Sequence, residues 1–288
     1  MIILNYSMRI LFILLCLFTS CARNPVTGKS EWAFIPESQE ISLGEQNYSL
    51  MQQAEGGILT VDPEILDYVR KVGNKIASAS DRSYLPFEFV VLNNSIPNAW
   101  ALPGGKIAIN RGLLTALESE AQLAALLSHE IVHSAARHVA QEIERSLLMQ
   151  TGLIGLKSLL KGHRYEDLAT QSGAIGTGLV HLKYSRNAEL QADRYGIKYT
   201  LVAGYDPQAA VELQKIFLDL QEKQDVNWLL GWLSTHPPAK KRVKANIQPT
   251  EHYLPGGFRG QKEYQQAIAS LTKNKKAYEA LDQGSRLY

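Results

Sequence analysis

Apolar residues recur along most of the chain at the spacing of an amphipathic helix. This pattern predicts helices over residues 38–55, 62–79 and 115–146. It predicts further helices over residues 181–203 and 207–223, the first of them closed by Gly204 and Pro207. The apolar positions of the second predicted helix are Ile65, Tyr68, Val69, Val72 and Ile76.

Two segments between these helices have the composition of β-strands. Residues 86–94 are rich in β-branched and aromatic side chains. Residues 98–110 fit a strand, a Pro-Gly-Gly turn and a second strand. The sequence therefore predicts an α+β fold that is mostly helical, with a small sheet.

The segment 115–146 differs from the other predicted helices because it is apolar nearly all round. A helix of this kind is buried in a protein core. Its polar residues therefore need partners, since an unpaired polar group is costly to bury. The apolar positions are Leu123, Leu126, Leu127, Ile131, Val132, Ala135, Ala136 and Val139.

This buried helix carries His129 and His133, four residues apart, with Glu130 beside the first. Residues i and i+4 share one helix face, so both imidazoles can point to one metal ion. Glu130 lies one residue round the helix, where a carboxylate can reach a metal-bound water and act as a general base. The alternative is a pair of core histidines with ordinary hydrogen-bond partners.

A catalytic zinc takes three protein ligands and leaves the fourth position open. Glu189 is the candidate for the third ligand, and Asp193 shares its helix face four residues later. Asp193 can accept the outer N–H of a ligand histidine and fix its tautomer. A solvated acidic face is the alternative. His138 lies off the face of His129 and His133, and no metal role is expected for it.

Charge and cysteine content narrow the classes of function. The formal net charge of +2 over 288 residues provides no basic field for nucleic acid. The two cysteines, Cys16 and Cys21, both lie near the N-terminus, so neither a disulfide framework nor cysteine metal ligands are expected.

The N-terminus has the pattern of a secretory signal. Arg9 precedes the apolar run 10–18, which is followed by Thr19, Ser20 and Cys21. As a helix this run reaches about 14 Å, less than half of the roughly 30 Å hydrocarbon core. We expect residues 1–20 to be a signal peptide and Cys21 to carry a lipid. Residues 21–36 would then be a lipid-attached tether, with the outer membrane favoured over the inner.

Several motifs together resemble a known family. The motifs HEIVH and AELQAD, at residues 129–133 and 188–193, resemble the gluzincin zinc metallopeptidases of the HtpX and CAAX-prenyl-endopeptidase type. The stretches NPVTG, NAWALPGGKIAIN and STHPPAKKR resemble the bacterial periplasmic lipoprotein members. The resemblance implies a zincin-type domain with one zinc ion per chain, held by His129, His133 and Glu189, with Glu130 as the base.

The resemblance also implies that His236 and Arg242 reach the site and stabilise the oxyanion of the transition state. Pro237 and Pro238 stiffen the loop after His236. A further hypothesis is that His236 occupies the open zinc position at rest and leaves when substrate arrives.

An edge strand beside the metal-binding helix would allow an extended peptide to pair with it. The candidate substrate-binding residues are Asn98, Ala99, Trp100 and Ala101. Pairing through the backbone would give a broad sequence preference.

The domain organisation follows from these assignments. We expect a metallopeptidase domain over residues 37–255 and a C-terminal helical tail over residues 256–288. The expected activity is zinc-dependent hydrolysis of misfolded or damaged envelope proteins, with extended or unfolded polypeptides as partners. The alternative is an envelope assembly or chaperone-like binding factor, in contact with the assembly machinery, whose zinc is structural or rarely used.

Overall fold

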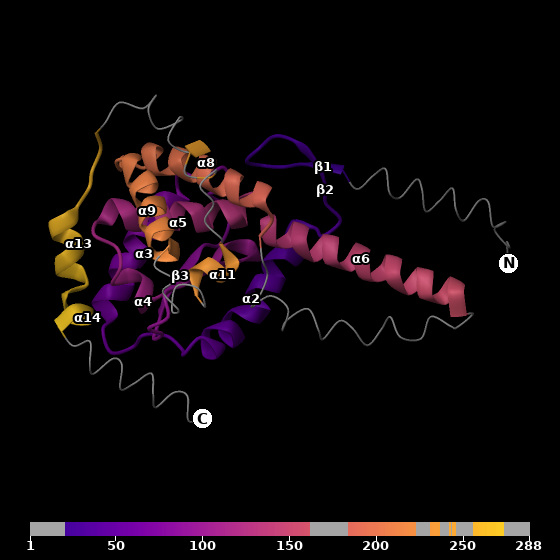
Figure 1. The fold of residues 1–288 in the computed structure, drawn as a ribbon, viewed down its shortest axis with the longest axis horizontal. Coiled ribbons are helices and arrows are strands. Elements are labelled where there is room, and N and C mark those ends of the chain that lie inside the picture. The colour runs from indigo at the N-terminus through magenta and orange to yellow at the C-terminus, as the bar shows by residue number, and fades with distance from the viewer. Residues whose placement is uncertain are drawn as a thin grey trace.

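The computed structural model places the predicted helices around one small sheet (Figure 1). The structure describes residues 21–161, 184–222, 231–236, 242, 244–245 and 256–273. The predicted signal peptide, the start of the helix predicted at 181, the Pro-Pro turn after His236 and the end of the tail lie outside these residues. The other histidines, His163, His181 and His252, also lie outside them.

Helices form most of the described chain. They are α2 (Glu37–Ala54), α3 (Pro63–Ala77), α4 (Arg111–Leu114), α5 (Glu120–Ala135), α6 (His138–Lys161), α8 (Arg186–Val202), α9 (Gln208–Glu222), α11 (Trp232–Thr235), α13 (Gln261–Ala267) and α14 (Ala269–Lys273). The mostly helical α+β fold predicted from the sequence is confirmed.

The main sheet has three strands in the order β3 (Glu88–Leu92), β5 (Lys106–Asn110) and β4 (Ala99–Leu102). β3 pairs parallel with β5, and β4 pairs antiparallel with it, joined through the short helix η1 (Pro103–Gly105). The predicted strand, turn and strand are therefore present, and β4 lies at the edge of the sheet.

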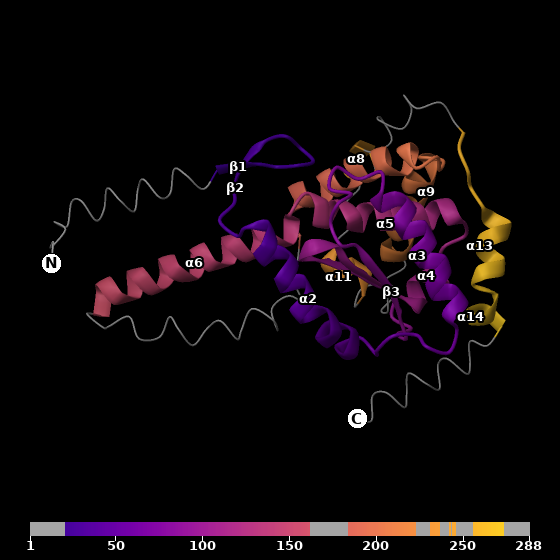
Figure 2. The same ribbon diagram turned by 180° about the vertical axis from the view of Figure 1, so that it is seen from behind.

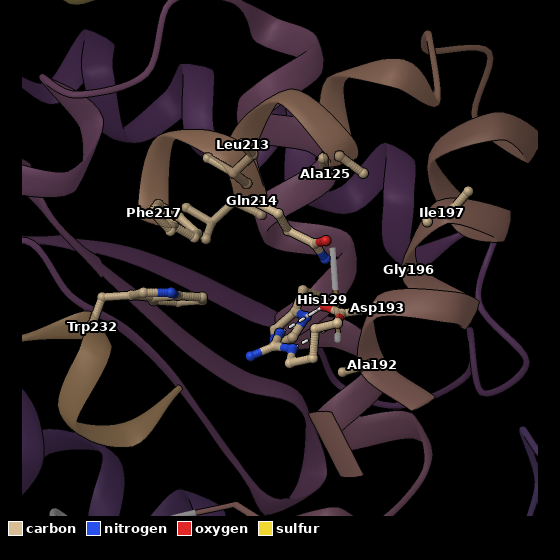
Figure 3. Close-up of a pocket in the computed structure, with 13 residues that line it drawn as sticks. Ala125, His129, Ala192, Asp193, Gly196, Ile197, Leu213, Gln214, Phe217 and Trp232 are labelled. Atoms are coloured by element: carbon tan, nitrogen blue, oxygen red, sulfur yellow. Dashed lines mark hydrogen bonds and ion pairs between the residues drawn. The ribbon is translucent and has the colours of Figure 1, made fainter. Parts of the chain in front are cut away.

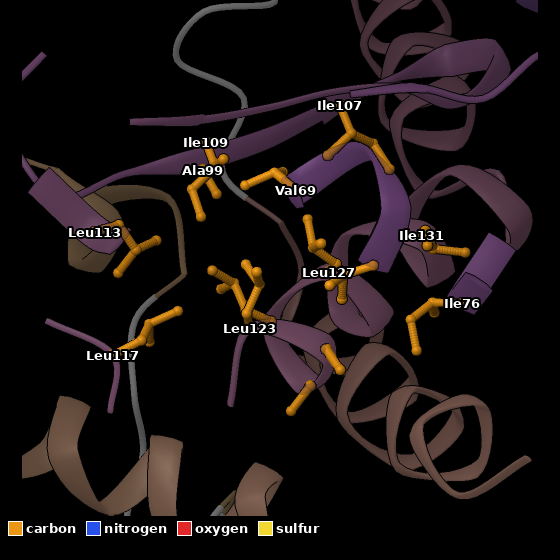
Figure 4. Packing of buried hydrophobic residues seen from close by; sticks show 14 of the residues in the cluster. Val69, Ile76, Ala99, Ile107, Ile109, Leu113, Leu117, Leu123, Leu127 and Ile131 are labelled. Atoms are coloured by element: carbon orange, nitrogen blue, oxygen red, sulfur yellow. The ribbon is translucent and has the colours of Figure 1, made fainter. Parts of the chain in front are cut away.

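Helix α5 lies at the centre of the fold and contacts α3, α8, α9 and the sheet. Ser119 caps it by accepting a hydrogen bond from the backbone N–H of Gln122. Leu123, Leu127 and Ile131 pack against α3 and the sheet in the main core (Figure 4). Each such side chain contributes about 1.5–3 kcal/mol on full burial, so the polar face of α5 is held by a rigid frame.

The helix predicted over residues 115–146 is broken at Arg137. This residue has a φ of 61°, a left-handed conformation that is uncommon outside glycine. Its guanidinium binds Glu40 at 3.0 Å and donates to the carbonyl of Ile35 at 2.6 Å, and Glu144 lies 3.5 Å away. Contacts from distant segments thus stabilise a break that helical periodicity does not reveal.

The segment after Cys21, where a tether was expected, forms a hairpin. β1 (Cys21–Arg23) pairs antiparallel with β2 (Ser30–Trp32). Asn24 is buried, accepts the N–H groups of Val26 and Thr27, and donates to the carbonyl of Ala136 at the end of α5. The hairpin is therefore fixed to the C-terminal end of α5.

The C-terminal helices are packed on the body rather than separate from it. Tyr264 of α13 is fully buried, and its hydroxyl donates to the carbonyl of Leu114. α13 and α14 lie at the opposite end of the molecule from α6, which projects from the body (Figures 1 and 2). No helix within the described ranges is long and apolar enough to cross a membrane.

Candidate metal centre

The structure brings together four side chains that could hold a metal ion, and they come from three separate elements. His129 and His133 come from α5, Glu189 from the first turn of α8, and His236 from the residue that follows α11. One ligand atom from each lies within 4.8 Å of every other, and all four residues are buried. The i, i+4 pair on α5 and Glu189 on α8, the candidate third ligand, are thus neighbours.

The interatomic distances within this cluster suit one small ion. The two histidine Nε2 atoms are 3.1 Å apart, and they lie 3.7 Å (His129) and 3.5 Å (His133) from carboxylate oxygens of Glu189. Ligand atoms each about 2.0–2.1 Å from a tetrahedral zinc are separated by roughly 3.3–3.4 Å. Two nitrogens and one carboxylate oxygen are also the ligand types that zinc prefers.

Buried polar atoms without partners test whether the residues present fit a metal ion. Both carboxylate oxygens of Glu130 and Nε2 of His236 have no hydrogen-bond partner within the described part of the chain. Glu130 and His236 are fully buried, and Oε1 of Glu130 lies 3.6 Å from Nε2 of His236. Unpaired buried groups are expensive, so the residues present fit a metal ion with a bound water.

A close approach of two helices sets the distance between the ligands. Gly196 of α8 packs against α5, where an added Cβ would lie 3.3 Å from the backbone nitrogen of His129. A larger residue would therefore separate α8, which carries Glu189, from α5.

Asp193 lies where its spacing predicted, next to a ligand histidine. Its Oδ1 is 3.1 Å from Nδ1 of His129. The Nδ1–H of His129 donates to this carboxylate, which leaves the Nε2 lone pair facing Glu189 and the metal site. Burial alone raises the pKa of Asp193, but Arg242 and His129 lower it below its ordinary value, so Asp193 is ionised.

Arg242 reaches the site, but its guanidinium contacts the protein's own carboxylates. It donates from Nε and Nη2 to the two oxygens of Asp193, at 2.7 Å each. Its Nη1 forms an ion pair with Oε2 of Glu189 at 2.5 Å. In this arrangement Arg242 orients the carboxylates of Asp193 and Glu189.

Burial perturbs the carboxyl group of Glu130, which lies beside the clustered histidines. Burial raises its pKa to about 8, although His129 acts in the opposite direction. In the metal-free protein this carboxyl therefore holds a proton at neutral pH. A bound cation would favour the ionised form that a general base requires.

His236 is held in place by α11. Its ring stacks on Trp232 at a centroid distance of 4.1 Å, and its Nδ1 lies 2.9 Å from Oε1 of Glu189. Its Nε2 therefore faces Glu130. The sequence offered no signal for Trp232.

His138 is not one of the four clustered side chains, but it contacts one of them, which the sequence did not indicate. Its Nδ1 lies 3.0 Å from Nδ1 of His133, and its Nε2 lies 3.1 Å from Oε1 of Gln191. The break at Arg137 redirects the chain, so that a residue off the ligand face of a continuous helix reaches the back of His133.

Tyr184 was also missed by the sequence analysis. Its ring stacks on His133 at 3.7 Å, and its hydroxyl donates to the carbonyl of Ala101 at 3.4 Å. Tyr184 therefore lies between the metal-binding helix and the edge strand.

The proposed substrate-binding strand lies at the edge of the sheet beside the site, and its residues are buried. They are Asn98, Ala99, Trp100 and Ala101. Asn98 Oδ1 and Trp100 Nε1 have no hydrogen-bond partner in the described part of the structure.

Two cavities lie close to the metal-binding cluster. The smaller, of about 30 Å³, has His129, Asp193, Phe217 and Trp232 in its lining (Figure 3). It has room for about one water molecule. The larger, of about 500 Å³, lies between β2, α6 and α8, and its lining includes His138 and Gln191.

An HExxH helix packed against a second helix that presents a glutamate is typical of one class of zinc metalloproteases. The comparison with protein families agrees: the model of "Peptidase family M48" matches residues 66–248. The chain belongs to peptidase family M48.

Individual relatives carry protease names. The chain is 35% identical over 242 residues to the mitochondrial metalloendopeptidase OMA1 of Schizosaccharomyces pombe, covering 83% of this chain and 68% of the relative. It is 29% identical over 225 residues to a beta-barrel assembly-enhancing protease of Yersinia pestis, covering 76% and 45%. With OMA1 of Arabidopsis thaliana it is 31% identical over 214 residues, covering 74% and 42%. The chain thus spans less than half the length of the latter two relatives.

Proposed function

We propose that this protein is a zinc-dependent endopeptidase that cleaves extended or unfolded polypeptides. The observation that carries the proposal is the convergence of the two HExxH histidines and Glu189 around one point, with the unpaired Glu130 carboxylate beside it. We assign His129, His133 and Glu189 as the ligands of one zinc ion per chain.

Zinc bound here would supply a Lewis acid and an acidified water for peptide hydrolysis. Glu130 takes the proton of the attacking water and delivers it to the leaving amine. Asp193 holds the tautomer of His129, and Arg242 holds the carboxylates of Glu189 and Asp193 in place. His236 presents Nε2 toward Glu130, where the imidazole can donate to the developing oxyanion.

The position of His236 also supports the hypothesis that it blocks the open zinc position at rest. One of its ring nitrogens belongs to the same group of atoms as the three assigned ligands. Substrate binding would then require His236 to withdraw from its place against Trp232.

Substrate would bind along β4 by strand addition. β4 is the edge strand and contacts α5, so a peptide paired with it would cross the metal site. Tyr184 bonds the carbonyl of Ala101, and a peptide that uses this carbonyl would have to displace the tyrosine hydroxyl.

The cellular setting is part of the same proposal. Residues 1–20 would be a signal peptide, and Cys21 would carry a lipid that holds the enzyme on the periplasmic side of the outer membrane. The relatives named beta-barrel assembly-enhancing proteases support a link to envelope assembly. Substrates would be misfolded or damaged envelope proteins, as for a lipoprotein of the HtpX and CAAX-prenyl-endopeptidase type.

The name of those relatives also favours a second candidate, a binding factor for envelope assembly that rarely cleaves. The variant Glu130→Gln distinguishes the two. It keeps the metal ligands but removes the base, so casein cleavage should fall by about 10²–10⁴-fold with zinc retained. Cleavage at the wild-type rate would exclude the mechanism. Full rescue of a deletion strain by the variant would establish the binding factor instead.

A further inference from the structure

The two histidines proposed as ligands on α5 differ in the group that contacts their Nδ1 atoms. His129 donates its outer N–H to the carboxylate of Asp193. Among the residues that the structure describes, no carboxylate takes the corresponding place at His133, and its Nδ1 faces another imidazole, that of His138, at 3.0 Å. Both His133 and His138 are buried, so water does not take over this hydrogen bond.

The amide oxygen of Gln191 determines the direction of both hydrogen bonds, the one between His138 and Gln191 and the one between His133 and His138. Oε1 of Gln191 accepts only, so the Nε2 of His138, 3.1 Å away, carries the hydrogen. In a neutral imidazole the other nitrogen is then an acceptor. Nδ1 of His138 therefore accepts from Nδ1–H of His133, which leaves the lone pair of His133 on Nε2, facing Glu189.

We propose that His138 and Gln191 form a neutral hydrogen-bond relay that fixes the tautomer and ring orientation of His133 for metal binding. His138 is a positioning residue, since it acts through His133. The inference rests on the proposed function, because a metal gives the orientation of Nε2 its purpose.

The relay also ties the two metal-binding helices together. Gln191 lies two residues after Glu189 on α8, while His133 and the break that positions His138 belong to the end of α5. A displacement of α8 along α5 would therefore disturb Glu189 and the orientation of His133 at the same time.

The choice of variants follows from the large cavity behind the relay. His138 and Gln191 both line it, so a small residue at position 138 would admit a water that could replace the acceptor. His138→Leu fills the space without an acceptor, whereas His138→Asn offers an amide oxygen near the place of Nδ1. Asn187→Ala is the matched control, because Asn187 is an exposed residue of α8 that lines the same cavity.

The experiment measures the zinc dissociation constant of the full chain by competition with a chelator, and thermal unfolding with and without zinc. His138→Leu should bind zinc about 10–100-fold more weakly, the usual loss for a partner of a ligand histidine. His138→Asn should stay within a few-fold of wild type, and Asn187→Ala should not change. At saturating zinc, the KM of His138→Leu for a peptide should match that of wild type.

Other outcomes separate the relay from its alternatives. Equal loss of melting temperature in the zinc-bound and zinc-free forms of His138→Leu, with unchanged affinity, would make His138 merely structural and overturn the relay. Equally weak binding by His138→Asn would also overturn it. If His138→Leu does not fold, Gln191→Met tests the same relay and should weaken zinc binding several-fold. An unchanged zinc affinity in Gln191→Met would overturn the relay. Failure of the wild type to bind zinc would instead refute the proposed function.

Discussion

Replacing Arg242 with glutamine tests how the carboxylates of the metal site are held. In the structure the guanidinium makes two 2.7 Å hydrogen bonds to Asp193 and a 2.5 Å ion pair with Glu189. Both acids are buried, and Arg242 is itself only 9% exposed, so solvent does not replace these contacts.

The expected magnitude follows from this burial. Removing one partner of a buried ion pair costs about 3–5 kcal/mol, because the remaining charge is left uncompensated. We expect the metal-free variant to lose stability of this order in chemical denaturation. Zinc affinity should also fall by about 10–100-fold, since Glu189 and the partner of His129 both lose their orientation.

The competing explanation is the oxyanion role that the resemblance implied. It predicts a fall in kcat of about 10²–10³-fold with zinc affinity and stability unchanged. Chelator competition and denaturation measured on the same preparations separate the two. Arg194→Gln is the control, as it makes the same charge change at an exposed position next to Asp193. Wild-type zinc affinity in Arg242→Gln would refute the orienting role.

Three further expectations follow from other parts of the structure. Burial raises the pKa of Glu130 to about 8 from an ordinary 4.5. Between these two pH values the folded metal-free protein therefore holds one proton more than the unfolded chain. Its stability should therefore fall by several kcal/mol as pH rises through this window, at about 1.4 kcal/mol per pH unit; an equal slope in Glu130→Gln would contradict this. Gly196→Val should lower the free energy of unfolding by about 1–3 kcal/mol through overpacking, and it should weaken zinc binding. An unchanged melting temperature and zinc affinity would contradict the close approach of α8 to α5. Asn24→Ala should lose about 1–3 kcal/mol and speed proteolysis of the hairpin, unlike the exposed control Lys29→Ala; equal proteolysis of the two would contradict the hairpin anchor.

The sequence was sufficient where one local regularity determines the structure. Helical spacing placed His129 and His133 on one face and did the same for Glu189 and Asp193. The strand, Pro-Gly-Gly turn and strand over residues 98–110 depended on equally local signals, and the structure has this arrangement.

The sequence was insufficient where distant contacts override local preference. The apolar pattern continues through Arg137, and the break there depends on Glu40, which lies 97 residues away in the chain. His138 enters the site only because of that break. Tyr184 and Trp232 reach the histidines through ring packing, which has no periodic signature along the chain.

The orientation of Arg242 could not be predicted for a related reason. The resemblance implied that Arg242 reaches the site, but two acids there compete for one guanidinium. Asp193 receives two of its hydrogen bonds in the structure. The sequence-based expectation considered only the developing charge on a substrate.

The proposed metal site can be tested by measuring the zinc content of the purified protein and of two single-residue variants. We expect one zinc per chain in the wild type, near-complete loss in His129→Ala, and retention in Glu130→Gln. Zinc retained in His129→Ala, or a wild type that binds none under saturating metal, would contradict the site assembled from α5 and α8.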